Sequence, residues 1–266
     1  MAYRLIERIA IMNQSVLKAL DILSLFTQEK HEYSLTDISN KLDMPKPTAY
    51  RLVTALESRG FLIKKKFSDH DIRYVLGLRL LELGNLVSEK LEVRKIAYPY
   101  MKKLCDEINE DVHLVIADGH EAIYIEKVEG NQALRLHTKV GMRSALHVGS
   151  GPKLLLAFKD AAFIDDYFLK TNLSALTPHS SLTSHYELSK EMEGIRYNGY
   201  SISRGEQDAE TIGISYPIRD HTGSVAAALA VSGPTIRFFG ERGQVIQDET
   251  QRTAVAISQQ LGYRND

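Results

Sequence analysis

The sequence predicts an α+β protein with a small helical N-terminal domain and a larger C-terminal domain built on an antiparallel sheet. Between residues 15 and 60, apolar side chains recur at helical spacing, and a short hairpin pattern follows. From residue 111 onward, β-prone runs alternate with glycine-containing turns. The chain has 266 residues, 44% hydrophobic and 25% charged, which is an ordinary globular composition and long enough for two domains.

Positive charge is concentrated near the N-terminus. Residues 1–80 hold 13 basic and 9 acidic side chains, a balance of +4, whereas the remainder holds 20 and 25, a balance of −5. Between residues 41 and 66, seven basic residues stand against two acidic ones. A basic patch at one end of a neutral body is typical of a small nucleic-acid-binding domain, although a solvated surface gives the same count.

Membrane and disulfide classes are disfavoured by the composition. No run approaches the ~18 to 20 apolar residues of a membrane helix, and the charged N-terminal segment is a poor signal peptide. We therefore expect a cytoplasmic protein without membrane contact. Cys105 is the only cysteine, which excludes an intrachain disulfide and a cysteine-rich zinc site, and we expect it to be a small buried residue.

Three helices are expected at the start of the chain. The first covers residues 15–28, and the second covers 34–42 because Ser34 and Asp37 form a capping-box pattern. The third lies within "MPKPTAYRLVTALESRG", where Pro47 suits the first helical position and Gly60 suits the position after the end. Its inward stripe consists of Ala49, Leu52, Val53 and Leu56. Its outer face consists of Pro47, Arg51, Thr54 and Ser58.

A basic hairpin follows the third helix, with strands at 61–66 and 72–76. Helix, short helix, turn, helix and basic hairpin is the order of a winged helix-turn-helix, whose last helix enters the DNA major groove. Arg51 is the best candidate for reading a base, because its planar fork can pair with guanine. The residues expected to contact DNA are Thr36, Lys46, Pro47, Thr48, Tyr50, Arg51, Thr54, Lys64, Lys65 and Arg73. A winged helix that binds only protein is the alternative.

The remainder of the chain divides into a joint and a second domain. We expect a DNA-binding domain over 1–84, a linker helix over 85–98, and a C-terminal domain over 99–266 that opens with a helix near Pro99. Its strands are expected at 112–119, 122–130, 133–141, 212–220 and 224–234. Its helices are expected at 153–158, 160–169, 186–198 and 241–261.

Catalytic motifs are missing from the second domain. Lys153 lacks the glycine and hydroxyl neighbours of a phosphate-binding loop, and Ser150 lacks the flanking glycines of a nucleophile elbow. No two histidines have the i, i+4 spacing of a helical metal site. We therefore expect no enzyme activity, metal or cofactor. Gly149, Ser150 and Gly151 instead precede a helix, where small residues and free N–H groups suit an anionic ligand.

Both halves together resemble the IclR-type bacterial transcriptional regulators, over about residues 14–262. The resemblance rests on "SVLKALDILSLF…LTDISNKLDMPKPTAYRLVTALESRGFL", "GMRSALHVGSGPKLLLAF" and "GIRYNGYSISRGEQDAETIGISYPIRDHTGSVAAALAVSGP". It implies a GAF-like effector-binding C-terminal domain and a homodimer or tetramer. It also implies regulation of transcription, more commonly repression, by binding double-stranded operator DNA under the control of a small organic acid. A metabolite sensor that acts through protein partners is the alternative. Residues 1–11 precede the resemblance, so Met12 is an alternative start to Met1.

The resemblance also implies an effector pocket. Its residues are Arg135, Ser150, Gly151, Ser203, Thr211, Gly213, Ala230 and Ser232, and the candidate counter-charges are Arg135, His137 and Arg143. Many family members have an acidic residue in place of Ser203 and a cysteine in place of Gly213, and some have serine in place of Ala230. Because Gly213 and Ala230 are smaller, we expect a roomier pocket with a less polar floor. Such a pocket suits a sugar acid or an aromatic acid better than glyoxylate.

Overall fold

The computed structural model describes residues 14–27, 29–68, 71–90, 92–132, 138–173 and 184–264. The expectations on Met1, Met12, Arg135 and His137 lie outside these ranges. The chain divides into two compact units, Met1–Lys90 and Leu91–Asp266. The boundary between them in the sequence falls within the linker that we placed at 85–98. Within the described ranges, no helix combines the length and the apolar character needed to cross a membrane.

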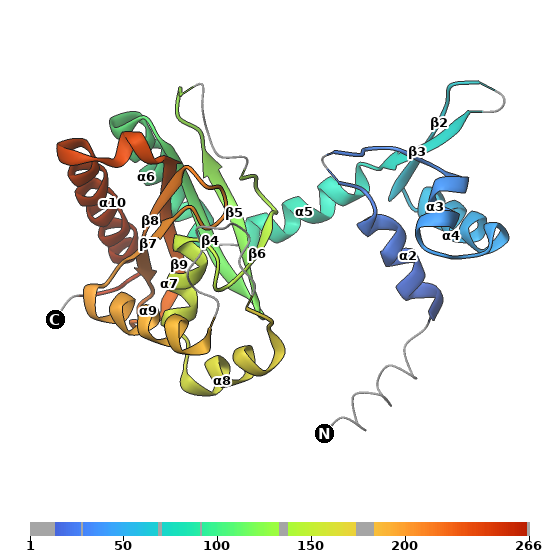
Figure 1. The fold of residues 1–266 in the computed structure, drawn as a ribbon. Coiled ribbons are helices and arrows are strands. Elements are labelled where there is room, and N and C mark those ends of the chain that lie inside the picture. The colour runs from blue at the N-terminus through green and yellow to red at the C-terminus, as the bar shows by residue number, and fades with distance from the viewer. Residues whose placement is uncertain are drawn as a thin grey trace. The chain divides into compact units, whose positions relative to one another are not determined.

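The first unit combines helices with an antiparallel sheet that includes β2 and β3 (Figure 1). The sheet has three strands in the order β1-β3-β2. Its elements are α2 (Gln14–Ser24), β1 (Tyr33–Ser34), α3 (Leu35–Lys41), α4 (Lys46–Ser58), β2 (Leu62–Lys66), β3 (Ile72–Leu76) and α5 (Arg79–Lys90). This order confirms the winged helix-turn-helix, with β2 and β3 as the wing. The two-residue strand β1 was not expected.

The start and end of α4 follow from its flanking residues. Pro45 is the N-cap and Pro47 takes the second helical position, one place later than expected, where a missing N–H still costs no helical bond. Gly60 follows the C-cap with a φ of +75°, a conformation that glycine adopts without strain. Ala49 and Val53 are fully buried in the core of the unit, which confirms the inward stripe.

The helix-turn-helix is held by local hydrogen bonds. Ser34 accepts from the backbone N–H of Asp37 at 3.1 Å, and Asp37 accepts from that of Ser34 at 3.0 Å, which confirms the capping box. In the turn, the Ser39 hydroxyl donates to the carbonyl of Met44 at 2.7 Å, and the Met44 N–H donates to the carbonyl of Ser39 at 3.0 Å. Since Met44 is buried as well, the angle between α3 and α4 is tightly set.

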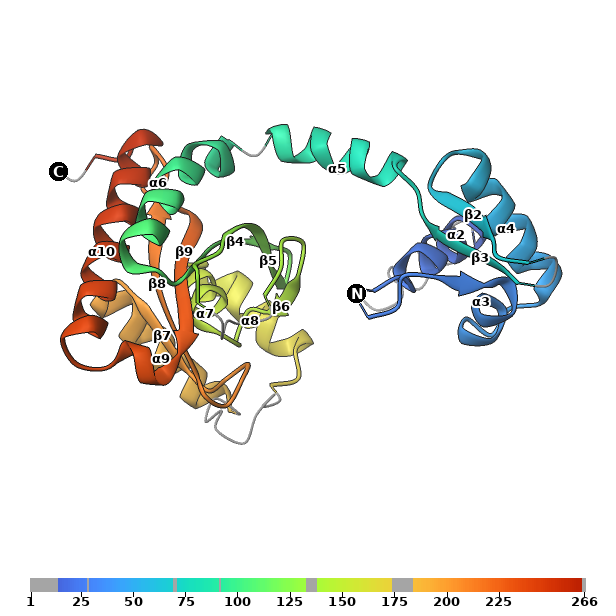
Figure 2. The same cartoon turned by 90° about the horizontal axis from the view of Figure 1, so that it is seen from above.

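The second unit contains an antiparallel sheet with helices packed on it, as expected; the sheet has six strands, and helices cover both of its faces (Figures 1 and 2). The strand order is β6-β5-β4-β9-β8-β7. The strands are β4 (Asp111–Asp118), β5 (Glu121–Val128), β6 (Arg143–Ala145), β7 (Ser201–Arg204), β8 (Thr211–Arg219) and β9 (Val225–Pro234). One face is covered by α6 (Glu92–Ile108), the 3₁₀ helix η1 (Thr235–Phe238) and α10 (Gly240–Gln260). The other is covered by α7 (Ser150–Ala157), α8 (Ala161–Lys170) and α9 (His185–Asn198).

Two expected elements differ from the structure. We expected a helix to begin near Pro99, but α6 begins at Glu92 and passes through this proline. Val93 and Ile96 pack against the same core as the later part of α6, so tertiary contacts offset the hydrogen bond that proline removes. Of the strand expected at 133–141, residues 138–141 form no strand and 133–137 lie outside the described ranges.

Cys105 lies buried on the inner side of α6, as expected for a small core residue. Burial is the main cause that raises the pKa of its thiol to about 11, and nearby carboxylates add to the effect. A thiol with so high a pKa stays protonated at neutral pH and is a poor nucleophile.

Candidate functional site

The outer side of α4 presents the side chains that we expected to face DNA. Lys46, Pro47, Tyr50, Arg51 and Thr54 are exposed, Thr48 is half-buried, and Thr36 is exposed on α3. No carboxylate interrupts this face before Glu57, which is half-buried. The first backbone N–H groups of α4 contribute little, because Pro47 has none and that of Thr48 donates to the carbonyl of Pro45. The side chains are therefore the groups that can reach a groove.

The wing carries exposed lysine side chains on β2. Lys64 and Lys65 are exposed, and Lys65 lies directly opposite Arg73 on β3. Arg73 donates to Asp71 Oδ1 at 2.9 Å and to Glu32 Oε1 at 2.7 Å. The contacts with Asp71, and then those with Glu32, raise the pKa of Arg73. Two carboxylates thus neutralise the charge of Arg73, and these ion pairs would have to break before Arg73 could contact a phosphate.

The second unit holds a small cavity of about 20 Å³ at the N-terminal end of α7, room for about one water molecule. Seven of the eight expected effector residues line it: Ser150, Gly151, Ser203, Thr211, Gly213, Ala230 and Ser232. The lining residues that we did not expect are His113, Tyr124, Thr138, Gln207 and Ile212. The eighth expected residue, Arg135, lies outside the described ranges. We call this space the inner cavity.

The strand register brings the expected residues together. Ser203, Gly213 and Ser232 stand opposite one another across β7, β8 and β9. Ser215, Ala230 and His113 form the next row, across β8, β9 and β4. Because side chains alternate between the faces of a sheet, both rows point to the side covered by α7.

The floor of the inner cavity is tighter than we expected. A Cβ atom at Gly213 would lie 2.7 Å from Ser150 Oγ, so the glycine lets α7 approach the sheet and leaves no added room. The Ser215 hydroxyl donates to Ser150 Oγ at 2.7 Å and fixes that approach. The expectation of a roomier pocket is therefore wrong, because the serine of α7 fills the space that the glycine leaves.

The expectation of a less polar floor is also wrong, because His113 lies beside the serine hydroxyls. Its Nε2 atom is 3.0 Å from Ser232 Oγ, and its ring meets that of Tyr124 edge to face at 5.8 Å. Its Nδ1 atom is buried without a hydrogen-bond partner among the described residues. Burial is the main cause that lowers the pKa of His113 to about 3, and Lys127 contributes. The imidazole is therefore neutral at neutral pH.

Acid should destabilise the second unit through His113. The unfolded chain takes up a proton near pH 6.5, whereas the folded histidine stays neutral down to about pH 3. Between these values the unfolded state binds more protons, so the free energy of unfolding falls with falling pH by up to about 1.4 kcal/mol per pH unit. Urea unfolding at pH 7 and pH 5 should show a smaller pH effect in His113→Phe than in the wild type. His221→Phe, on an exposed turn, is the control. Equal pH effects in the wild type and His113→Phe would contradict this role.

A buried ion pair fixes the wall of the inner cavity. Lys153, 1% exposed, donates to Glu206 Oε1 at 2.6 Å and to Glu191 Oε1 at 3.0 Å. Glu206 in turn accepts from the backbone N–H of Gly149 at 2.8 Å. These contacts tie the loop after β7 to the start of α7. Neither Glu206 nor its pairing with Lys153 was expected from the sequence.

A larger hollow of about 440 Å³ lies beyond the inner cavity, and Thr138 and Gln207 line both. The Gln207 amide donates to the Tyr124 hydroxyl at a long 3.3 Å. Arg143, an expected counter-charge, lines this outer hollow and not the inner cavity. It donates to Asp118 at 2.6 Å and to Glu121 at 2.9 Å, so its charge is already paired.

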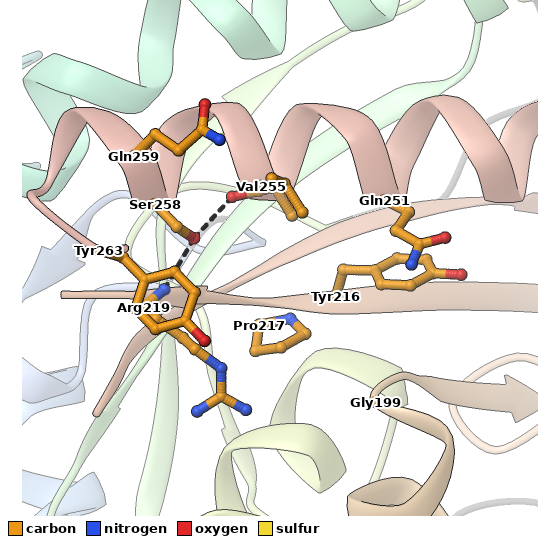
Figure 3. Close-up of a pocket in the computed structure, with 10 residues that line it drawn as sticks. Gly199, Tyr216, Pro217, Arg219, Gln251, Val255, Ser258, Gln259 and Tyr263 are labelled. Atoms are coloured by element: carbon orange, nitrogen blue, oxygen red, sulfur yellow. Dashed lines mark hydrogen bonds between the residues drawn. The ribbon is translucent and has the colours of Figure 1, made fainter. Parts of the chain in front are cut away.

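A third hollow, of about 290 Å³, lies between β8 and α10 and contains none of the expected residues (Figure 3). Tyr216, Pro217 and Tyr263 form its walls, with Gln251 and Gln259 on the helix above. The buried Ser258 hydroxyl accepts from the backbone N–H of Arg219 at 2.9 Å. In the part of the chain that the structure describes, no group of three or more histidine, cysteine or carboxylate side chains could hold a metal ion.

Two family descriptions together match most of the chain. The IclR helix-turn-helix domain matches residues 15–65. The C-terminal domain of the bacterial transcriptional regulator IclR matches residues 86–259. The first match covers the outer face of α4 and most of β2, and the second covers the inner cavity.

Individual relatives agree with these descriptions. The HTH-type transcriptional regulator KipR of Bacillus subtilis is 36% identical over 251 residues, which cover 94% of this chain and 98% of KipR. The HTH-type transcriptional regulator KdgR of Escherichia coli is 30% identical and covers 94% of each chain. The crystal structure of Thermotoga maritima IclR superposes with a TM-score of 0.76 at 31% identity, covering 94% of this chain and 99% of that one. An IclR homologue from Microbacterium hydrocarbonoxydans, solved with 4-hydroxybenzoate, has a TM-score of 0.81 at 24% identity, covering 93% and 99%.

Proposed function

This chain belongs to the IclR family of bacterial transcriptional regulators, and from that premise we propose that it is a cytoplasmic repressor controlled by a small organic acid. The first unit binds double-stranded operator DNA, and the acid binds in the inner cavity. The observation that carries this function is the presence, in one chain, of a carboxylate-free outer face on α4 and a polar cavity at the start of α7. The protein is a regulator and not an enzyme.

DNA recognition is assigned to α4, with support from the wing. Arg51 and Thr54 lie one turn apart on the exposed side, where an arginine fork can pair with a guanine edge. Lys64 and Lys65 lie on the exposed strand β2, and lysines so placed bind phosphates and fix the register of a protein on the duplex. A sensor that acts only through protein partners has no need of this arrangement.

The inner cavity suits the carboxylate of an organic acid. The N–H groups of Ser150 and Gly151, the first residues of α7, have no acceptor within the helix, and this end of the helix favours an anion. Hydroxyl groups of Ser203, Thr211 and Ser232 line the same space, and its described lining contains no lysine or arginine. We therefore propose that backbone N–H groups and hydroxyls hold the charge.

The volumes of the inner cavity and the outer hollow limit where each part of the effector can lie. A volume of about 20 Å³ holds about one water molecule, so the wall must move to admit even the carboxylate, and the body of the molecule must extend past Gln207 into the outer hollow of about 440 Å³. Among the described residues, Gln207 is joined to the cavity wall by the long hydrogen bond to Tyr124, which a ligand can displace. The presence of 4-hydroxybenzoate in a relative agrees with an acid that has a sizeable body.

Deforming the inner cavity should remove the response and leave DNA binding intact. In Gly151→Val the new Cβ atom lies 3.1 Å from Val115 Cγ2 and 3.7 Å from Ala230 Cβ, so the added side chain crowds the start of α7 against the sheet and deforms the wall of the inner cavity. We expect wild-type operator affinity to change about 5- to 150-fold with an acid that binds, and Gly151→Val not to respond. The measurement is fluorescence anisotropy of operator DNA with 4-hydroxybenzoate, benzoate, gluconate and glyoxylate.

The matched control is Gly194→Val on α9, where nothing lies within 4 Å of the new Cβ atom. It should respond like the wild type. A Gly151→Val protein that still responds would place the effector elsewhere, and unchanged wild-type affinity with all four acids would leave the effector outside these chemical classes.

We further propose a homodimer, with a tetramer as a dimer of dimers, because the first unit exposes large apolar side chains. These are Val16 and Leu20 on α2, Leu78 before α5, and Leu81 and Leu86 on α5. A second copy of the chain would cover them and present two copies of α4 to the half-sites of an operator. Light scattering at micromolar concentration should give at least twice the chain mass of 29.9 kDa. Leu20→Glu should lower that mass, and a wild-type monomer would contradict the proposal.

A further inference from the structure

Strand β5 contains a bulge beside the inner cavity. Leu114 on β4 pairs with Glu126, but the next residue, Val115, pairs with Tyr124, so Ile125 has no partner in the ladder. A bulge of this kind turns neighbouring side chains away from simple alternation and is common beside functional sites. The position of this one follows from the register alone.

The bulge links the two faces of the sheet. Tyr124 points to the α7 side, where it lines the inner cavity against His113. Ile125 belongs to the core on the α6 side, and Glu126 points to that side too because it pairs with Leu114 of the same core. One short stretch of backbone therefore carries a cavity wall on one face and two groups facing α6 on the other.

Arg94, in the first turn of α6, binds the bulge from the α6 side of the sheet. Its Nε atom donates to the Ile125 carbonyl at 3.1 Å, and its Nη2 atom lies 2.8 Å from Glu126 Oε2. The Glu126 carboxylate is almost buried, and its other oxygen accepts from the N–H of Lys127 at 2.9 Å. Arg94 thus binds both the Ile125 carbonyl and the Glu126 carboxylate. The compact unit that contains the winged helix ends just before this helix, at Lys90.

We propose that Arg94 and Glu126 are positioning residues that transmit the state of the inner cavity to the first turn of α6. An acid that displaces the Tyr124 ring moves the bulge peptide next to it, and Arg94 carries this movement into the helix that leads from the winged helix-turn-helix. The inference rests on the proposed function, because it assigns the route by which the effector acts. If the Arg94–Glu126 pair served only stability, a change in the cavity would affect α6 to the same extent with or without Arg94.

Hydrogen exchange in the full chain tests this coupling without DNA or ligand. Tyr124→Ala removes the cavity wall. It should speed exchange at the backbone amides of Ile96, Ala97, Tyr98 and Tyr100, which belong to the first turns of α6, by about 2- to 30-fold. In an Arg94→Met background the same change should have no further effect. In the control background Arg252→Met, on an exposed part of α10, the full increase should remain.

An equal increase in the Arg94→Met background, or no increase in the wild-type background, would overturn the proposal. If Tyr124→Ala does not fold, Gln207→Ala replaces it, since that change keeps the Tyr124 ring and removes the hydrogen bond to its hydroxyl. The exchange result also stands apart from the proposed function. A chain that binds no DNA would refute the regulator, whereas a failed exchange test would refute only this route.

Discussion

Lys153→Met is expected to lower the free energy of unfolding of the second unit by about 3–5 kcal/mol, the usual cost of breaking a buried ion pair from one side. The methionine keeps the length of the side chain but leaves Glu206, itself buried, without its cation. The loss should reach the inner cavity, because Glu206 also holds the N–H of Gly149 at the start of α7. Urea unfolding followed by circular dichroism measures the change.

The matched control for this substitution is Lys103→Met on α6. Lys103 is 77% exposed and lies 3.7 Å from Glu107, so its loss should change stability by about 0.5 kcal/mol or less. The double variant Lys153→Met with Glu206→Gln should recover part of the loss, because the carboxylate that remains, Glu191, is 37% exposed and stays hydrated. Equal stability of Lys153→Met and Lys103→Met would show that the pair is not buried in solution.

Arg51→Ala should weaken binding to the operator by about 1–3 kcal/mol and relax the preference for one base pair. Arg51 is exposed on α4, one turn before Thr54, and its neighbours Leu52 and Val53 hold the helix to its core. Its loss therefore removes a contact to DNA without disturbing the fold. Fluorescence anisotropy with operator variants changed one base pair at a time would locate the base that Arg51 reads.

Lys65→Ala provides the contrast, because we propose that this lysine on the wing contacts phosphate and not a base. It should weaken binding to all sequences alike and reduce the slope of log affinity against log salt by about 1. If Arg51→Ala left both the affinity and the footprint unchanged, Arg51 would not belong to the reading surface. A Lys65→Ala slope equal to that of the wild type would remove the wing from the interface.

The elements set by local chemistry could be predicted from the sequence. The capping box at Ser34, the glycine after α4 and the hairpin of the wing each depend on residues close together in the chain, and each has the expected form. The effector residues on β8 and β9 were placed through the resemblance, and the strand register brings them to one face. Elements of two to four residues, such as β1 and β7, contain too little periodicity to be recognised.

What could not be predicted depends on contacts between distant residues. Lys153 and Glu206 are 53 positions apart, and the residues next to each of them in the sequence do not indicate a buried ion pair. The tight floor of the inner cavity arises because Ser150 enters the space over Gly213, which side-chain sizes at single positions do not reveal. The bulge at Ile125 breaks the alternation of β5, so that Tyr124 joins His113 on the cavity face. A period-two pattern gives no sign of that change of face.

The most direct test of the central claim is the specificity of the full chain for DNA. A labelled fragment from the region upstream of its own gene and a scrambled fragment of equal length should be titrated at physiological salt. We predict that the upstream fragment binds at least about 10³-fold more tightly than the scrambled one, as sequence-specific regulators do. Equal affinity for the two fragments would contradict a repressor that reads this operator through α4.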